Sequence, residues 1–474
     1  IRINMTLPNK ASLHIVILVV VCLALFLPGS LMRGLWTPDE TRYAAVSKAM
    51  VDSGDWLTLR VNGQIYTQKP PVFFWAISLF GLLSGGVNDI AARLVSVFSG
   101  IGTVAATYIF TRRLFNGSIA LVSCLVLGTT LAFFAASQMV MLDALFTFLT
   151  VSAIYLLYAG IEDGGRMRGI RYFAAFTLMA LATLTKGPVG IILPVLAASA
   201  YALLKGRMKA LLSWGATLGF IAFLAIIASW LVPACIRGGE EYTKELLGRQ
   251  IFGRYFEAFD HKEPLLYYFY AFPAGFLPWA VLLPAAISLL VKDRKDGRVK
   301  LLAAWPLSIL FFFTISSSKN ILYTLPAYPA AAMAIGYWWD KERRPLRYLF
   351  ISIAVMLALS ASVSLFVMPH IDRLKSPKYF GSRIAEHIGH EGNLSVYLVK
   401  PVYWLYYSGR NQMDEFHDYD KLDKYLRSTE RVFCIIELHI YREYISANKN
   451  HGYLVDYEGY RKGNALALIS NRIK

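Results

Sequence analysis

Apolar runs of about 17–24 residues recur along most of the chain, and short polar loops separate them. A helix needs about 20 mostly apolar residues to cross the hydrocarbon core of a bilayer. Of the 474 residues, 56% are hydrophobic and only 17% are charged, which is too apolar for a soluble domain. The sequence therefore predicts a polytopic α-helical membrane protein.

Hydropathy predicts about eleven membrane spans and one shorter apolar segment. The segment 70–86 follows Lys69 and begins with two prolines. It is too short for a full span, so we expect an interfacial or half-inserted helix there. The first apolar run lacks a small-x-small cleavage pattern and is expected to be a span, not a signal peptide. The spans are expected at roughly residues 12–32, 90–111, 117–137, 144–160, 171–185, 187–204, 210–233, 264–291, 301–316, 321–339 and 348–369.

The loop charges test this count, because short cytoplasmic loops are enriched in Lys and Arg. If the N-terminus, with Arg2 and Lys10, is cytoplasmic, every short basic loop falls on the cytoplasmic side. If 70–86 were counted as a full span, all the later basic loops would fall outside. Much of the net charge of +17 is thus explained by membrane orientation, and no nucleic-acid partner is expected. The loops concerned contain Arg112 and Arg113; Arg166, Arg168 and Arg171; Lys205, Arg207 and Lys209; residues 292–300; and residues 341–347.

From about residue 370 the chain changes character. Three β-prone runs, at 394–399, 431–436 and 465–469, alternate with polar helix-like stretches. This pattern predicts a small α/β domain, which the same orientation places outside the membrane. We therefore expect two domains: a membrane domain at 1–369, whose first outer loop is 33–89, and a C-terminal domain at 370–474.

The four cysteines show no metal-ligand spacing. Cys22 and Cys124 lie in apolar runs, whereas Cys235 and Cys434 lie outside them, so a bridge between the latter two stays open. No cofactor is expected. A divalent metal is possible but not indicated.

The first outer loop carries a dense polar cluster, Thr37-Pro-Asp-Glu-Thr-Arg-Tyr43. One interpretation is a capping box, with Thr37 as N-cap and Glu40 at N3. The other is a functional site, because Arg42 and Tyr43 lie three and four residues after Asp39 and can flank its carboxylate on one helical face. The two interpretations are compatible, since a fixed cap is a good mount for a catalytic carboxylate.

The other candidate residues on the outer face also have structural alternatives. Asp143, at the mouth of a span, is either an N-cap or a site carboxylate. Lys69 either reaches the headgroup region or binds a phosphate at the start of the next helix. Arg249 and Arg254 form either a cationic patch or a solvated loop face, and His261 is most simply a loop histidine. Tyr66, Lys186 and Tyr323 fall on the same face.

Two carboxylates and several cations at one membrane face suit one kind of chemistry. A lipid-phosphate leaving group needs cations as its charge develops. A carboxylate can deprotonate an acceptor hydroxyl or stabilise an oxocarbenium-like centre. The sequence has no P-loop and no dinucleotide fingerprint, which argues against a nucleotide-activated donor.

The first-loop residues also carry a family resemblance. Pro38-Asp-Glu-Thr-Arg-Tyr43, followed by Ser53-Gly-Asp-Trp56 and Lys69-Pro-Pro71, resembles the ArnT/protein-mannosyltransferase-like family of GT-C glycosyltransferases. Within it, the likeness is greatest to 4-amino-4-deoxy-L-arabinose lipid A transferases. Weaker matches follow in order to about residue 340 and include Leu142-Asp-Ala144, Leu184-Thr-Lys-Gly-Pro188, Leu277-Pro-Trp279 and Tyr323-Thr-Leu-Pro326.

The resemblance implies a GT-C fold and transfer of a sugar from a polyprenyl-phosphate donor to a lipid or glycan acceptor. It implies a multi-pass protein of the bacterial inner membrane with a periplasmic active site. Asp39 would be the principal catalytic carboxylate and Asp143 the second acidic residue, with Lys69 and Arg254 on the donor phosphate. The residues expected to line the cavity are Glu40, Arg42, Tyr43, Tyr66, Lys186, Arg249 and Tyr323.

Three alternatives stay open. The same chemistry could act on a protein hydroxyl, an O-antigen or another envelope glycan. A lipid or polysaccharide transporter would instead place ionisable residues along its spans and carry repeated halves, and neither pattern is obvious here. A non-catalytic scaffold for glycan assembly is the third.

Overall fold

The computed structural model describes residues 10–246, 248, 263–389, 392–446, 452–458 and 465–472. By their internal contacts, the residues form two compact units. Unit 1 comprises Ile1–Ser30, Thr67–Phe73 and Arg93–Ala361, and unit 2 comprises Leu31–Tyr66, Phe74–Ala92 and Ser362–Lys474. The predicted boundary near residue 370 stays a prediction, but the structure shows that most of the first loop, apart from Thr67–Phe73, belongs to the same compact unit as the C-terminal segment.

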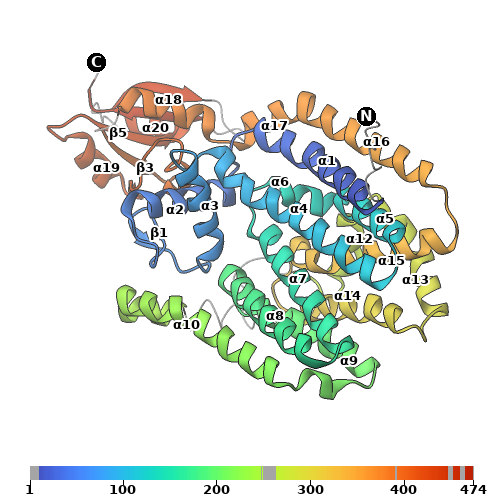
Figure 1. The fold of residues 1–474 in the computed structure, drawn as a ribbon. Helices are drawn as coiled ribbons and strands as arrows, with labels where there is room; N and C mark the ends of the chain where they lie inside the picture. The colour runs from blue at the N-terminus through green and yellow to red at the C-terminus, as the bar shows by residue number, and fades with distance from the viewer. Residues whose placement is uncertain are drawn as a thin grey trace, which may run out of the picture. The chain divides into compact units, whose positions relative to one another are not determined.

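Unit 1 is helical, as its apolar runs predict (Figure 1). The helix pairs α7–α8, α8–α9, α8–α10, α9–α14 and α5–α15 lie side by side. Its elements are α1 (Lys10–Leu31), α4 (Asp89–Leu114), α5 (Gly117–Gly128), α6 (Leu131–Gln138), α7 (Leu142–Glu162), α8 (Gly165–Lys186), α9 (Val189–Leu204), η1 (Met208–Leu211), α10 (Trp214–Thr243), α12 (Tyr267–Gly275), η3 (Trp279–Leu282), α13 (Leu283–Lys292), α14 (Gly297–Ile315), η4 (Ile321–Ala327), α15 (Tyr328–Lys341) and α16 (Leu346–Ser362).

Six helices among the described residues are long and apolar enough to cross a membrane, and up to eight if each of two bent pairs is one span. The bent pairs are Gly117–Gly128 with Leu131–Gln138 and Tyr267–Gly275 with Trp279–Lys292. The predicted spans carried by α8, α9 and α15 do not pass this test, so the count of eleven stays a prediction. The short segment after Lys69 forms α3 (Val72–Leu83), whose 12 residues are only about 18 Å long.

The unit 1 helices pack through small residues and aromatic rings. Gly160 lies so close to the ring of Tyr172 that an added Cβ would come within 2.3 Å of it. Phe110 stacks on the fully buried Trp305 with 5.7 Å between ring centroids. Such close contacts hold membrane helices together, because lipid offers little hydrophobic force between them.

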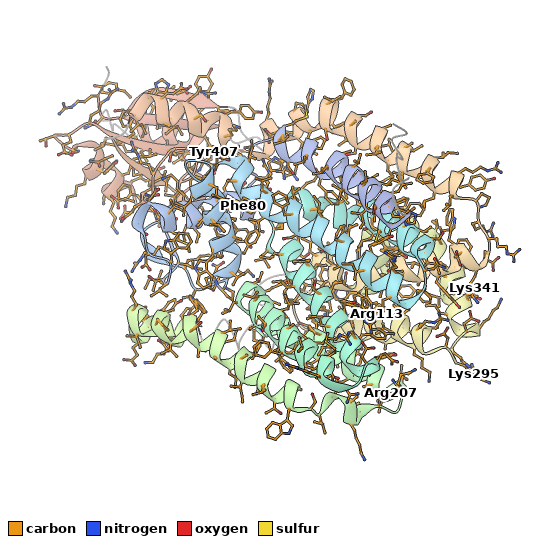
Figure 2. All side chains as sticks on the ribbon, in the orientation of Figure 1. Phe80, Arg113, Arg207, Lys295, Lys341 and Tyr407 are labelled. Atoms are coloured by element: carbon orange, nitrogen blue, oxygen red, sulfur yellow. The ribbon has the colours of Figure 1, made fainter. Side chains whose placement is uncertain are left out.

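The basic loops meet at one end of unit 1. The Arg113 guanidinium pairs with Asp163 at 2.6 Å, and Arg207 pairs with Glu162 at 3.1 Å. Three further contacts join the remaining loops: Arg298 Nη1 to Leu114 O at 3.3 Å, Lys300 Nζ to Leu204 O at 2.9 Å, and Lys341 Nζ to Asp293 Oδ2 at 3.9 Å. Figure 2 shows Arg113, Arg207, Lys295 and Lys341 in the same part of the view. This clustering is what the loop-charge argument requires, and the cytoplasmic side of that end stays a prediction.

Unit 2 contains a five-stranded sheet in the order β4-β3-β5-β7-β6. The three β-prone runs of the sequence form β3, β5 and β7, which confirms the small C-terminal α/β domain. The first three strands pair in parallel, and β5, β7 and β6 pair antiparallel. The elements of unit 2 are α2 (Asp39–Ser53), β1 (Arg60–Val61), β2 (Gln64–Ile65), α3 (Val72–Leu83), η5 (Val363–Val367), α17 (Met368–Lys375), α18 (Lys378–Ile388), β3 (Asn393–Tyr397), η6 (Pro401–Tyr403), β4 (Asp414–Phe416), α19 (Tyr419–Leu426), β5 (Val432–Glu437), α20 (Leu438–Ser446), β6 (Tyr453–Glu458) and β7 (Leu466–Ser470).

The two faces of this sheet bury different residues, as the two-residue period of a strand requires. On β5, Phe433 and Ile435 pack with Phe380 of α18, in a cluster that includes Ala45 of the first loop. Cys434 instead faces a cluster built by α19 and α20. The first loop is thus part of one face of the C-terminal core.

Polar contacts hold the first loop on that core. The Asn62 amide accepts from Met413 N at 2.7 Å and donates to Met413 O at 3.0 Å. The Asp89 carboxylate accepts from the hydroxyls of Tyr406 and Tyr407 at 3.0–3.1 Å. Asn62 and Gly63 have positive φ at the turn between β1 and β2, a conformation that favours these two residue types.

Candidate functional site

Asp39 is the first residue of α2 and forms an ion pair with Arg42, one turn further along the helix. The Asp39 side chain is 35% exposed, so its carboxylate is open to a ligand. The Arg42 guanidinium lies 5.7 Å from the centre of the Tyr43 ring. Burial lowers the pKa of Arg42, but Tyr66 and Asp39 raise it by more, so its net pKa is raised. The predicted grouping of Asp39, Arg42 and Tyr43 is therefore present in the structure.

The prediction of a capping box at the start of α2 is wrong. Pro38 takes the N-cap position and makes no side-chain cap hydrogen bond. The Glu40 carboxylate instead accepts from Arg33 at 2.5 and 2.9 Å and from the Trp36 backbone N–H at 2.8 Å. Because Arg33 and Glu40 are 5% and 1% exposed, charge pairing in a buried site determines where Glu40 points.

A second carboxylate fixes the loop that leads to Asp39. The Asp372 side chain, on α17, accepts from Gly34 N at 3.0 Å and from the Trp36 indole N–H at 2.8 Å. It also accepts from the Tyr379 hydroxyl at 2.9 Å. Asp372 is 1% exposed. The chain just before Asp39 is thus held by both Glu40 and Asp372.

Tyr43 and Tyr66 form the floor beside Arg42. Both are 4% exposed, and both pack edge-on against Phe74, at 5.6 and 5.8 Å between ring centroids. The Arg42 Nε atom is buried and has no hydrogen-bond partner among the described residues. This N–H is therefore an unsatisfied buried donor, which costs folding free energy.

Unit 1 carries the second predicted carboxylate. Asp143 lies in the first turn of α7 and pairs with Lys186, the last residue of α8. Their side chains are 11% and 9% exposed. The Lys186 Nζ atom lies 4.4 Å from the centre of the Tyr323 ring and 5.1 Å from that of Phe146. The structure therefore brings Asp143, Lys186 and Tyr323 together.

Asp143 is not an N-cap, since Met141 holds that position without a side-chain cap bond. The Lys186 ammonium draws the carboxylate toward α8. This pair lies at the opposite end of α7 from Glu162, and 21 helical residues separate the two ends by about 30 Å. That separation matches the thickness of a bilayer core.

The turn after Lys186 contains two glycines, Gly187 inside the Leu184–Pro188 motif and Gly190 just after it. Gly187 has φ +87°, a conformation that side chains disfavour. An added Cβ at Gly190 would lie 2.2 Å from Thr183 N, so α8 and α9 touch through backbone at this point. Gly187 and Gly190 thus allow the tight turn between α8 and α9 that follows Lys186.

The remaining predicted residues are placed only in part. Lys69 is half-buried, lies three residues before α3 and belongs to unit 1. Arg249, Arg254 and His261 lie outside the described residues.

The sequence did not indicate Arg33 and Asp372, because their roles depend on partners in α2 and in the first loop. All four cysteines are free thiols, so the Cys235–Cys434 bridge left open by the sequence is not formed.

Comparison with known proteins finds matches to a family, to curated relatives and to solved structures. Residues 11–242 match the family described as dolichyl-phosphate-mannose-protein mannosyltransferase. A curated relative, the undecaprenyl phosphate-alpha-4-amino-4-deoxy-L-arabinose arabinosyl transferase of Pseudomonas aeruginosa, is 32% identical over 311 residues, which are 64% of this chain and 56% of that protein. The chain thus spans just over half the length of such relatives.

Two of the solved structures that resemble this chain illustrate the shared fold. One is ArnT from Cupriavidus metallidurans bound to undecaprenyl phosphate, with a TM-score of 0.84, 21% identity and 98% of each chain covered. The other is the oligosaccharyltransferase AglB from Archaeoglobus fulgidus in complex with an inhibitory peptide and a dolichol-phosphate. Its TM-score is 0.55 and its identity 11%, with 91% of this chain and 70% of that chain covered.

Proposed function

We propose that this chain, which resembles the ArnT-like glycosyltransferases of the GT-C superfamily in both sequence and fold, transfers a sugar from a polyprenyl-phosphate-linked donor to an envelope acceptor such as lipid A. The reaction would take place at the periplasmic face of a bacterial inner membrane. The observation that carries the proposal is the partly exposed Asp39 carboxylate, which pairs with Arg42 and follows a loop held by Asp372 and Glu40.

The proposed reaction breaks the bond between the anomeric carbon and the phosphate oxygen of the donor. The acceptor hydroxyl forms the new bond at the same carbon and gives its proton to Asp39, which acts as general base. The polyprenyl phosphate leaves with the bonding electron pair. Lys69 and Arg254 neutralise its charge, and attack from the face opposite to the phosphate inverts the anomeric configuration.

Arg42 and the Asp143–Lys186 pair have supporting roles in this proposal. Arg42 orients the Asp39 carboxylate and holds a positive charge beside it. Asp143 holds the Lys186 ammonium against the Tyr323 ring, where the cation can meet a donor or acceptor phosphate.

The test is transfer by the purified protein in lipid, supplied with a panel of polyprenyl-phosphate sugars, with products identified by mass spectrometry. Asp39→Asn keeps the size of the side chain but removes the base, so we expect a loss of about 100-fold or more in rate. Asp52→Asn, on the same helix and 39% exposed, is the matched control and should keep full activity. Equal rates for the two variants would refute the assignment of Asp39.

The donor-phosphate roles have a separate readout. Lys69→Ala and Arg254→Ala each remove one charge-assisted contact of about 1.5–3 kcal/mol, so we expect donor KM to rise about 10- to 100-fold. An unchanged donor KM in both variants would contradict these two roles and leave that of Asp39 intact.

A second candidate function keeps this chemistry and changes the acceptor to a protein hydroxyl or another glycan. The mannosyltransferase description of the matching family and the peptide held by the AglB structure favour it. The same assay decides between the two when lipid A, a Ser/Thr peptide and an O-antigen glycan are offered as competing acceptors.

A further inference from the structure

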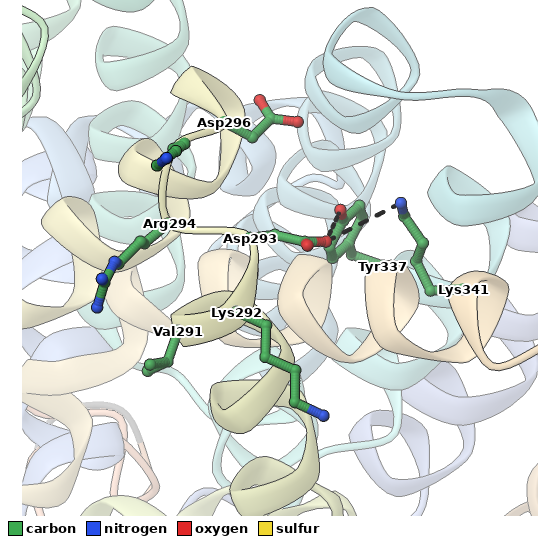
Figure 3. Close-up of a pocket in the computed structure, with 8 residues that line it drawn as sticks. Val291, Lys292, Asp293, Arg294, Asp296, Tyr337 and Lys341 are labelled. Carbon is green, nitrogen blue, oxygen red and sulfur yellow. Dashed lines mark hydrogen bonds and ion pairs between the residues drawn. The ribbon is translucent and has the colours of Figure 1, made fainter.

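A cavity of about 580 Å³ opens at the end of unit 1 where the basic loops meet (Figure 3). It lies between the end of α13, the turn into α14 and the end of α15. Its size is within the range of pockets that hold small ligands. None of the residues proposed above for sugar transfer contributes to it. Its lining consists of Val291, Lys292, Asp293, Arg294, Lys295, Asp296, Tyr337 and Lys341.

The two carboxylates of the cavity are already engaged. Asp293 accepts from the Tyr337 hydroxyl at 2.5 Å and lies 3.9 Å from the Lys341 ammonium. Asp296 caps α14 through the Arg298 N–H at 2.8 Å and pairs with the Arg298 guanidinium at 2.6 Å. Figure 3 shows the Asp293 side chain turned toward Tyr337 and Lys341. The carboxylates are therefore not available to neutralise the other cations.

Three cations of the lining, Lys292, Arg294 and Lys295, are exposed and have no carboxylate partner among the described residues. In Figure 3, Lys292 and Arg294 extend away from Asp293. The cavity thus has an excess of positive charge, with ammonium and guanidinium donors that match phosphate oxygens.

An apolar surface adjoins these cations. Ile287 and Val291 lie one turn apart on α13 and are 54% and 58% exposed. Two exposed aliphatic side chains in line on a membrane helix provide a surface for an acyl chain, and the cations lie within one to four residues of Val291. A free phosphate would use only the cations, whereas a phospholipid would use both features.

We propose that this cavity binds the phosphate headgroup of an anionic phospholipid, with Lys292, Arg294 and Lys295 on the phosphate and α13 along the acyl chain. The loop-charge prediction places this end in the cytoplasmic leaflet. Basic pockets between helices bind anionic lipid headgroups on that side of other membrane proteins. The site is separate from the proposed transfer reaction and does not depend on it.

The experiment is native mass spectrometry of the full-length protein, titrated with dioleoyl phosphatidylglycerol or with dioleoyl phosphatidylcholine. The triple variant K292Q/R294Q/K295Q should bind phosphatidylglycerol on the order of 100-fold more weakly, since each cation near anionic lipid contributes about 1 kcal/mol. The matched control R112Q/R166Q/K209Q removes three exposed cations from other basic loops and should bind like the unmodified protein.

Two results would overturn the proposal. Equal loss of phosphatidylglycerol from the triple variant and the control would assign binding to general surface charge. The second result would be that millimolar inorganic phosphate displaces phosphatidylglycerol, and that the protein binds phosphatidylcholine as well as it binds phosphatidylglycerol. The ligand would then be a soluble phosphate. Selective loss in the triple variant, without competition by phosphate, supports the lipid site.

Discussion

Glu40→Gln tests whether the buried ion pair with Arg33 holds the loop before Asp39. The substitution keeps the shape of the side chain and removes its negative charge. Arg33 and Glu40 are 5% and 1% exposed, and two hydrogen bonds of 2.5 and 2.9 Å join them. The variant therefore leaves a guanidinium charge in a buried site without its carboxylate.

The expected cost follows from that burial. Removing one partner of a buried ion pair typically destabilises a protein by about 3–5 kcal/mol. Gln can still accept from Trp36 N, so we expect a value at the lower end, about 3 kcal/mol. The control is Asp52→Asn, near the other end of α2, where the pair with Lys48 is exposed at 39% and 25%. An exposed pair contributes about 0–1 kcal/mol.

The assay is thermal unfolding of the purified protein in one detergent, followed by near-UV circular dichroism and paired with the transfer assay. We expect Glu40→Gln to unfold well below the control and to lose activity as the loop loosens. The double variant Arg33→Met/Glu40→Met removes both charges and should recover most of the stability. A melting temperature for Glu40→Gln equal to that of Asp52→Asn would refute the reasoning.

Three further predictions follow from other contacts. The Arg298 hydrogen bond lowers the pKa of Asp296, although burial opposes it, so Asp296→Asn should cost stability at pH 7. Because a carboxyl group with a lowered pKa contributes stability that is lost as pH falls through its folded pKa, the difference in melting temperature should shrink as the pH of the melts is lowered below the ordinary Asp pKa. Burial raises the pKa of Cys434 to about 12 and leaves it 0% exposed, so maleimide at pH 8 should label it only after unfolding. Lys186→Met should lower transfer and stability by leaving Asp143 uncompensated, whereas adding Asp143→Asn should restore the melting temperature but not the activity.

Hydropathy and loop charge predicted the helical framework well, because both depend on local composition. The short helix α3, the apolar helices and the clustering of the basic loops follow from the pattern around each segment. The bends of 68° at residues 128–131 and 111° at residues 275–279 were not predicted. Each bend depends on how the two halves of a segment pack against other helices, which a hydropathy window does not contain.

The candidate site was predicted through motifs, and its supporting contacts were not. Asp39 and Arg42 are three residues apart, so their pairing can be read from helical spacing. Asp143 and Lys186 are on different helices, and only the fold joins them. Glu40 was interpreted as part of a cap because its true partner, Arg33, lies before the motif. Asp372 lies more than 300 residues away from Gly34 and no local pattern indicates their contact.

The assembly of unit 2 from distant segments has a consequence for how the protein is made. The loop that carries Asp39 emerges early from the ribosome, whereas Asp372, Met413 and the tyrosines that bind Asp89 follow only after the helices of unit 1. At about 5–20 residues per second, tens of seconds separate the two events. A nascent chain therefore carries Asp39 without the framework that positions it. Assembly of the candidate site is a late step of biogenesis, and a translation product that stops before Asp372 lacks that framework.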